Sequence, residues 1–216
     1  MHDRLNENIG RRDNFMGRVN KALGPNRKPT RLLSAAVLML VVACTSYVIM
    51  TDNFHAVTPG EAYRSAQLNP QDLDYYIKKY SIKSVLNLRG PNPDASWYKK
   101  EIKVCQKNKI MHFDVSLSAT SEPTARDVRQ LTQIFQNAPR PILLHCKAGA
   151  DRSGLVAAMW KIVVDKEPKA EAKKELSIVY GHVPLRGTEA MDQFFRDWQP
   201  GLAYQESPPA SSGTAK

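Results

Sequence analysis

The stretch Pro141–Trp160, "PILLHCKAGADRSGLVAAMW", joins two apolar segments through a short loop of small and charged residues. Its first part, "PILLHC", has the length and composition of a buried strand, and "SGLVAAMW" opens an apolar segment long enough for a helix. The loop between them carries Cys146, Gly149 and Arg152. A strand, a tight loop and a helix in this order form the repeating unit of an α/β fold.

Strand-like and helix-like segments alternate on both sides of this stretch. Because strands joined by helical crossovers run parallel, we predict an α/β fold with a mainly parallel central sheet flanked by helices. The domain should span residues 54–204. The strand-like segments are 61–67, 82–90 and 110–117, and the helix-like segments are 70–80, 95–108, 122–138, 153–165, 168–182 and 187–198.

The loop has the composition of an anion site. Gly149, placed between two alanines, lets backbone N–H groups turn inward without obstruction from side chains. Such a nest at a helix amino terminus binds an oxyanion and would stabilise the thiolate form of Cys146. Arg152 lies six residues after the cysteine, where its planar guanidinium can hold two phosphate oxygens at once. Ser153 can donate its hydroxyl to the sulfur.

With His145 in front, these residues spell H-C-x5-R-S, and the chain resembles the cysteine-based protein tyrosine and dual-specificity phosphatases, whose signature is H-C-x5-R-[ST]. The resemblance covers residues 54–180, where "YRSAQ" and "VLNLRG" look like compact bacterial members of the dual-specificity group. It implies a dual-specificity-phosphatase-like fold and phosphatase chemistry through a phosphocysteine intermediate. No metal or other cofactor is implied.

The resemblance also assigns roles within the signature. The implied roles are nucleophile for Cys146, phosphate and transition-state clamp for Arg152, sulfur partner for Ser153, support of the thiolate for His145, and phosphate-binding loop for Lys147, Ala148, Gly149 and Ala150.

Three other interpretations of the loop stay open. Cys146 could be a buried core thiol, since free cysteines are often buried. Rhodanese and arsenate reductase folds also place a cysteine in an anion-binding loop, although without this His-Cys and Arg-Ser-Gly combination. A catalytically weak module that binds a phosphorylated partner would need the same loop and no acid.

The residue that protonates the leaving group is not settled by the pattern. The family usually carries an Asp on the loop before the signature, and "SLSATSEPTARD" has none at the expected place. Asp151 comes first among the candidates, because its position within the signature resembles a subgroup of the family in which the signature loop itself carries the acid. Asp114 comes second, and Glu122 or no dedicated acid comes third. Asp151 could instead be a loop-stabilising carboxylate paired with a nearby base.

Three further basic residues are candidates for substrate binding. Arg64 and Arg89 stand at strand or turn ends that could face the same crevice, or they could be structural salt-bridge partners. Lys147 lies inside the loop, and "CKAG" resembles loops of phosphoinositide phosphatases. We therefore expect phosphotyrosine-type protein substrates first, and phosphoinositides or inositol phosphates second.

The net charge of +10 is unevenly distributed. Residues 1–31 hold eight Lys and Arg against three acidic residues, which gives this basic tail +5, half of the excess. No nucleic-acid partner is therefore expected. Residues 32–50 contain no charge, and as a helix they would reach about 28 Å, close to the thickness of a bilayer core. We predict a transmembrane helix there, with the tail cytoplasmic.

This orientation implies a single-pass protein of the bacterial inner membrane with a periplasmic catalytic domain. A cleaved signal is the alternative, including a lipoprotein with lipid on Cys44. Cys44, Cys105 and Cys146 show no C-x-x-C spacing, so neither a disulfide framework nor a zinc site is predicted. The polar residues 207–216 are expected to be a disordered tail, and the sequence does not indicate the oligomeric state.

Overall fold

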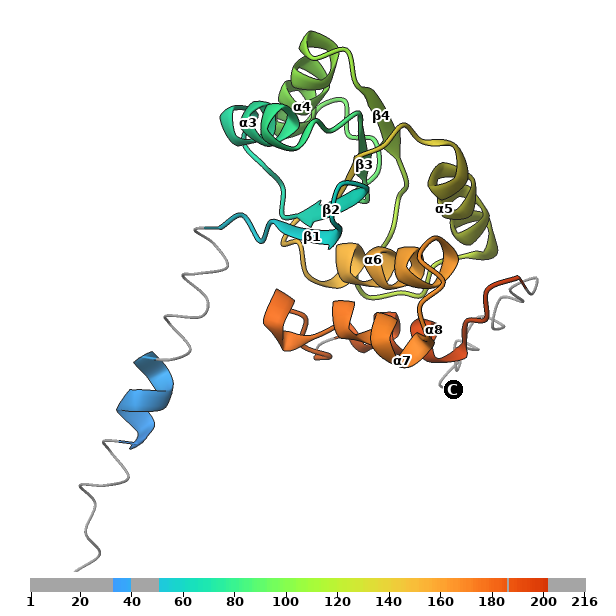
Figure 1. Cartoon of the computed structure of the whole chain (residues 1–216). Coiled ribbons are helices and arrows are strands. Elements are labelled where there is room, and N and C mark those ends of the chain that lie inside the picture. Colours follow the sequence, from blue (N-terminus) through green and yellow to red (C-terminus); the bar gives the residue numbers. More distant parts are fainter. Residues whose placement is uncertain (1–32, 40–50, 186, 202–216) are drawn as a thin grey trace, which may run out of the picture. The chain divides into compact units, whose positions relative to one another are not determined.

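The computed structural model describes residues 33–39, 51–185 and 187–201 (Figure 1). The chain divides into two units, Met1–Ser46 and Tyr47–Lys216. In the first unit, residues 33–39 form a helix. The predicted basic tail 1–31, the rest of the predicted membrane helix 32–50 and the predicted tail 207–216 lie outside the described residues. None of the helices in the described ranges combines the length and apolarity needed to cross a bilayer.

A five-stranded sheet forms the centre of the second unit. Its order is β1-β2-β5-β3-β4, and the pairings β2–β5, β5–β3 and β3–β4 are parallel. The edge pairing of β1 with β2 is antiparallel, so the sheet is mixed with a parallel majority. The strands are β1 His55–Thr58, β2 Ala62–Ser65, β3 Ser84–Asn87, β4 Met111–Asp114 and β5 Ile142–His145.

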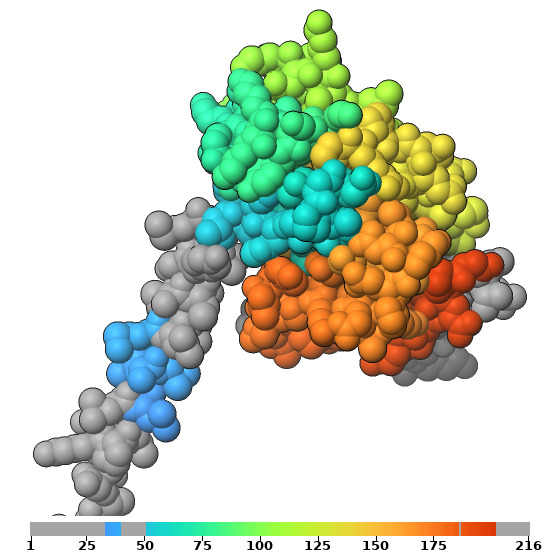
Figure 2. Space-filling view, viewed as in Figure 1, coloured from blue at the N-terminus to red at the C-terminus, as the bar shows by residue number. Residues whose placement is uncertain are grey.

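Helices cover both faces of this sheet. Helices α3 and α4 pack together on one face, and α5 and α6 lie on the other, with α7 and α8 packed against α6 (Figure 1). In Figure 2, the cyan residues of β1 and β2 separate the green residues of α3 from the orange residues of α6 and α7. The helices are α3 Pro70–Tyr80, α4 Ser96–Lys107, α5 Ala125–Asn137, α6 Asp151–Val163, α7 Lys169–Ala172 and α8 Glu189–Asp197, with 3-10 turns η1 Lys173–Glu175 and η2 Ile178–Tyr180.

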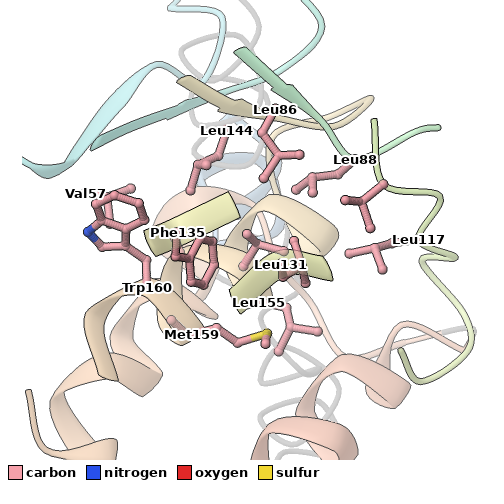
Figure 3. Close-up of a cluster of buried hydrophobic side chains, with 14 of the residues drawn as sticks. Val57, Leu86, Leu88, Leu117, Leu131, Phe135, Leu144, Leu155, Met159 and Trp160 are labelled. Atoms are coloured by element: carbon pink, nitrogen blue, oxygen red, sulfur yellow. The ribbon is translucent and has the colours of Figure 1, made fainter. Parts of the chain in front are cut away.

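The central strand feeds two hydrophobic cores. Ile142 and Leu144 belong to the core under α5 and α6, whereas Leu143 belongs to the core under α3 and α4. This alternation follows from the two-residue period of a strand, and it explains why β5 is apolar at consecutive positions. On the α6 face the rings of Phe135 and Trp160 meet edge to face, with their centroids 5.3 Å apart (Figure 3).

Local signals explain where two helices begin. Asn69 caps α3 by accepting from the N–H groups of the first turn, and Pro70 follows at the first helical position. Helix α5 starts after Thr124, which forms a capping box with Asp127. Helix α5 therefore begins at Ala125, three residues after the start predicted for the helix 122–138.

The predicted helix 168–182 is wrong in length. The segment forms the single turn α7 and then the two 3-10 turns. Helical geometry ends at Leu176, with φ −98° and ψ 72°. Just before this break, the buried Arg64 donates hydrogen bonds to both the carbonyl oxygen and the carboxylate of Glu175. This contact between distant parts of the chain fixes the backbone at the point where the helix ends.

Candidate active site

The loop after β5 lies in the middle of the sheet. β5 pairs with β2 on one side and β3 on the other, and all three strands run parallel, so their carboxyl ends meet at one edge. His145 ends β5 and α6 begins at Asp151, which leaves residues 146–150 as a tight loop. Open α/β sheets bind ligands at this edge. The strand, loop and helix predicted from the sequence are thus all present.

Two side chains hold the loop from outside. Side-chain nitrogens of Asn53 and Arg64 donate to the carbonyl oxygens of residues 148–150 at 2.9 to 3.1 Å. Because the carbonyl and N–H of a peptide point in opposite directions, the N–H groups are turned the other way. Among the described residues, no protein acceptor takes an N–H of residues 147–150. The loop can therefore bind an oxyanion through its backbone.

Gly149 is required at its position in this loop. Its φ is +70°, a conformation that side chains with a Cβ rarely adopt. A Cβ here would also lie 2.6 Å from the backbone nitrogen of Ala66 and 2.7 Å from the carbonyl carbon of Ser65. The loop thus packs directly on the end of β2, and glycine makes that approach possible.

Cys146, Ser153 and Arg152 come together around the loop. Cys146 is buried, and its Sγ lies 3.4 Å from Ser153 Oγ. Arg152 donates from Nη1 to the carbonyl oxygen of Leu117 at 3.3 Å, which places the guanidinium between the loop and the segment after β4. Within the described residues, the buried Arg152 Nε has no acceptor. A bound oxyanion would supply one, because a buried unpaired donor is costly.

A buried carboxylate supports the strand end behind Cys146. Glu101 Oε1 lies 3.2 Å from His145 Nε2 and 2.8 Å from His112 Nε2, and Glu101 Oε2 accepts from Gln67 Nε2 at 2.5 Å. Burial alone would raise the pKa of Glu101, but the charge of His145 and the three hydrogen bonds hold that pKa well below its ordinary value. The ionised carboxylate fixes the His145 ring.

Arg64 has a different place from the one predicted. It is fully buried, and its guanidinium holds the loop carbonyls, Glu175 Oε2 at 2.8 Å and the Glu175 carbonyl oxygen at 2.7 Å. The guanidinium also lies 4.5 Å from the centre of the Tyr180 ring. The structure therefore corrects its assignment to substrate binding. Arg64 supports the loop from behind, which is the salt-bridge role that the sequence left open.

Arg89 lies near the loop, at its outer side. Its guanidinium stacks 3.6 Å from the centre of the Trp97 ring, and Nη1 donates to Gln67 Oε1 at 2.8 Å. Partial burial, followed by the charge of Arg152, lowers the pKa of Arg89, so the two cations act on each other. Lys147 is exposed within the loop. Both residues remain predicted substrate contacts.

Asp114 is committed to structural hydrogen bonds. It ends β4, two strands from β5 and so about 10 Å away. Its Oδ1 accepts from Asn87 Nδ2 at 2.7 Å, and its Oδ2 accepts from the Tyr98 hydroxyl at 2.6 Å. Burial and the bond to this carboxylate raise the pKa of Tyr98 to about 12, so the donor keeps its proton.

Asp151 lies within hydrogen-bond distance of a base, as expected if it is a loop-stabilising carboxylate. Its Oδ1 lies 2.8 Å from Nδ1 of the buried His182. As the first residue of α6 it also stands where a carboxylate favours the positive end of the helix dipole. Glu122 lines a surface hollow with residues of α8, among them Asp192. Of the three acid candidates, Asp151 is the one attached to the signature loop.

Sequence reasoning missed several residues that build the site. They share contacts to partners far away in the chain, which a local motif cannot show, and all but the half-buried Gln67 are buried; these residues are Asn53, Gln67, Glu101, Glu175 and His182. One signal was available. Glu101 falls on the apolar face of α4 with Val104 and Cys105, where an acidic residue needs a partner.

Residues 51–193 match the sequence model of a family described as "DSP-PTPase phosphatase fused to NAD+ Kinase". Among solved structures, TpbA from P. aeruginosa is 24% identical, with a TM-score of 0.56 over 69% of this chain and 86% of that one. The core catalytic domain of the PP-IP phosphatase SIW14 from S. cerevisiae is 21% identical, with a TM-score of 0.56 over 68% and 85%. Both share the fold described above.

Proposed function

The chain belongs to the cysteine-based dual-specificity phosphatase family described as a DSP-PTPase phosphatase fused to NAD+ kinase, and we propose that it hydrolyses phosphomonoesters through a phosphocysteine at Cys146. One observation carries the proposal. The buried thiol begins a loop whose carbonyl groups are held outward by Asn53 and Arg64, and its sulfur lies 3.4 Å from the Ser153 hydroxyl of α6. Such a loop offers both a nucleophile and a site for the phosphoryl oxygens.

In the first step, the thiolate of Cys146 attacks phosphorus and the bond from phosphorus to the ester oxygen breaks. The loop N–H groups and Arg152 hold the three phosphoryl oxygens as their charge redistributes. The departing oxygen needs a proton, for which Asp151 is our candidate donor. The product is an alcohol or phenol and a phosphocysteine.

In the second step, water attacks the phosphocysteine and the sulfur–phosphorus bond breaks. Ser153 then donates a hydrogen bond to the departing thiolate, which lowers the barrier for its release. The group that protonated the leaving oxygen can now take a proton from water. Inorganic phosphate leaves, and Cys146 returns to its starting state.

Phosphotyrosine-type protein substrates are our first choice. A structure of the neighbour TpbA is described as a complex with pTyr. An aromatic leaving group also suits a site bordered by Trp97, which lines a hollow of about 200 Å³ with Leu68 and Pro70. The phenyl ring of the substrate could lie against the indole of Trp97 while the phosphate enters the loop.

Inositol phosphates are the second candidate, and a different feature favours them. Arg89 and Lys147 add two cations near a loop that already contains Arg152. A substrate with more than one phosphate would use them, whereas a single phosphomonoester needs the loop alone. The neighbour SIW14 is described as a PP-IP phosphatase.

The test is hydrolysis of p-nitrophenyl phosphate by wild type, Cys146→Ser and Cys105→Ala. Cys105 is the matched control, because it is also buried, and burial together with the charge of Glu101 raises its pKa to about 12. We expect Cys146→Ser to lose at least about 10³-fold in kcat and Cys105→Ala to stay near wild type. Equal activity of wild type and Cys146→Ser would refute the proposed enzymatic function and favour a phosphate-binding module.

We also propose that residues 32–50 anchor the enzyme in a membrane, with the catalytic domain on the far side. The proposal rests on the uncharged run and on the basic tail before it. An alkaline phosphatase reporter fused after Lys216 in bacterial cells should be active if the domain is exported. A silent reporter on a stable fusion would contradict this orientation.

A further inference from the structure

His182 is a buried imidazole held between two carboxylates. Its Nδ1 lies 2.8 Å from Asp151 Oδ1 and its Nε2 lies 2.7 Å from Asp192 Oδ2. The side chain is 1% exposed. The carboxylates come from different helices, because Asp151 begins α6 and Asp192 belongs to α8. The imidazole thus connects the start of α6 to α8.

The charges along this contact alternate in sign. An ionised carboxylate only accepts hydrogen bonds, so two carboxylates at the two ring nitrogens favour the imidazolium form, in which both nitrogens donate. Burial would lower the pKa of His182, but the hydrogen bonds and charges of Asp151 and Asp192 raise it. Lys173 forms an ion pair with the other oxygen of Asp192, so that each carboxylate of the contact lies next to a cation.

The segment that carries His182 is fixed against the signature loop. The carbonyl oxygen of Tyr180 accepts from Asn53 Nδ2 at 2.9 Å, and the same Nδ2 also holds the loop carbonyls. The His182 N–H donates to the carbonyl oxygen of Ser177 at 3.1 Å. A Cβ added to Gly181 would lie 3.8 Å from Cβ of Ala150. The imidazole therefore has a defined position relative to the loop.

We propose that His182 is a positioning residue for Asp151, which holds the carboxyl group at the start of α6 so that it can exchange a proton with the leaving oxygen and later with water. The inference rests on the proposed function. The contact uses Oδ1 of Asp151, and Oδ2 takes no hydrogen bond from any described residue. Oδ1 can accept from the Nδ1–H of His182 in either charge state of Asp151, so Oδ2 is left to carry the proton that passes to the leaving oxygen and, once ionised, to take a proton from water.

The same contact links the charge state of the acid to that of the imidazole. While His182 is protonated, Nδ1 donates to Asp151 and Nε2 donates to Asp192. When it loses a proton, one carboxylate loses its donor, and the orientation of Asp151 is no longer fixed in every molecule. Activity on substrates that need the acid should therefore fall as pH rises through the pKa of His182.

Two substitutions of similar size distinguish a positioning role of His182 toward Asp151 from a general contribution of His182 to stability. In His182→Asn the amide nitrogen takes the place of Nδ1 and can still donate to Asp151. In His182→Gln it reaches instead to the place of Nε2 and can donate to Asp192. Both remove the titratable ring, so we expect similar losses in the free energy of unfolding, measured with urea.

The substrates are phenyl phosphate, a poor leaving group, and p-nitrophenyl phosphate, a good one. On phenyl phosphate we expect kcat to fall about tenfold in His182→Gln and about twofold in His182→Asn, less than the roughly 10²–10⁴-fold that the acid itself contributes, because a misplaced acid is still present. On p-nitrophenyl phosphate both variants should stay within about twofold of wild type. The alkaline fall in kcat on phenyl phosphate should shift or disappear in His182→Asn.

Equal losses by both variants on both substrates, or an unchanged alkaline limb in His182→Asn, would overturn the positioning role while leaving the phosphatase intact. Absence of Cys146-dependent turnover in wild type would overturn both proposals. If neither variant folds, an NMR titration of His182 in wild type decides. Inorganic phosphate in the loop should raise the pKa of His182 through Asp151, and no change would refute the link.

Discussion

Two clusters of histidine and carboxylate flank the signature loop, and they are built in opposite ways. On the α4 side, one carboxylate, Glu101, serves His145 and His112. On the α8 side, one imidazole, His182, serves Asp151 and Asp192. In each cluster the central group is buried and its charged form is favoured, so the pKa of Glu101 falls and the pKa of His182 rises.

The difference indicates what each side of the loop has to do. The Glu101 cluster lies behind Cys146 and holds a ring that need not change charge during the reaction, so a permanently ionised carboxylate suits it. The His182 cluster holds Asp151, whose proton must move if it is the acid. An imidazole suits that side, because it can donate a hydrogen bond to a carboxylate and can itself change charge.

The largest effect should come from Glu101→Gln, which keeps the shape and removes the charge. Three donors converge on the two oxygens of Glu101, so the new amide nitrogen must face at least one of them. We expect the free energy of unfolding to fall by about 3 kcal/mol, because breaking a buried charged cluster leaves unpaired groups. Urea unfolding at pH 7 measures the loss.

The control for this change is Glu171→Gln. Glu171 also pairs with a base, Lys174, but its side chain is 55% exposed. A surface pair of this kind contributes about 0–1 kcal/mol. If Glu171→Gln and Glu101→Gln were equally destabilising, the distinction between a buried and an exposed carboxylate would be wrong.

Asp192→Asn should have the next largest effect. Asp192 pairs with Lys173 as well as with His182, and its side chain is 18% exposed, so water can replace part of what is lost. We expect the free energy of unfolding to fall by about 1.5–2 kcal/mol, the lower part of the range for a hydrogen bond to a charged group. Lys173→Gln separates the two contacts, since it should cost less than Asp192→Asn. A larger loss in Lys173→Gln would assign the main role to the surface pair.

The contrast between the clusters extends to pH. The pKa of Glu101 is lowered on folding, so its contribution to stability is present above the unfolded value near 4.3 and is lost as pH falls through the folded value. The pKa of His182 is raised, so its contribution is present below about 6.5 and is lost as pH rises through the folded value.

Urea unfolding from pH 3 to pH 9 tests these signs, because the contribution of Glu101 is lost only below about pH 4.3. The Glu101→Gln variant should lose part of the acid slope, and His182→Asn should lose part of the alkaline slope, each by about 1 kcal/mol over the range. The reverse assignment, with the alkaline slope lost in Glu101→Gln, would contradict the charge states given to the two clusters.

How far the sequence predicts this site depends on how local each part is. Cys146, Gly149 and Arg152 lie within seven consecutive residues, so their spacing alone predicts the anion site. The alternation of apolar segments likewise predicts the parallel part of the sheet. Arg64 and Glu175, by contrast, are 111 positions apart, and only the order of the strands brings them together. That contact also shortens a helix which local periodicity had predicted.

The choice of acid shows the same limit. The sequence places Asp151 before Asp114 as the candidate acid, but it does not show the hydrogen-bond partners that decide what each carboxylate can do. Tyr98 and Asn87 occupy both oxygens of Asp114, and His182 occupies one oxygen of Asp151. These partners come from other strands, helices and turns. No pattern within a single segment could show them.

The smallest effect should come from Gln67→Met, which tests how the Glu101 cluster reaches the substrate. Gln67 donates to Glu101 Oε2 and accepts from Arg89 Nη1, so it transmits the position of the buried carboxylate to a cation near the loop. Methionine keeps the length and removes both hydrogen bonds. We expect KM for an inositol phosphate to rise about threefold with kcat unchanged, because Arg89 would bind ground state and transition state alike.

The control is KM for p-nitrophenyl phosphate, which has one phosphate and should show no change. A fall in kcat on both substrates would instead mean that Gln67 acts through His145, and the two clusters would then differ less than their charges indicate.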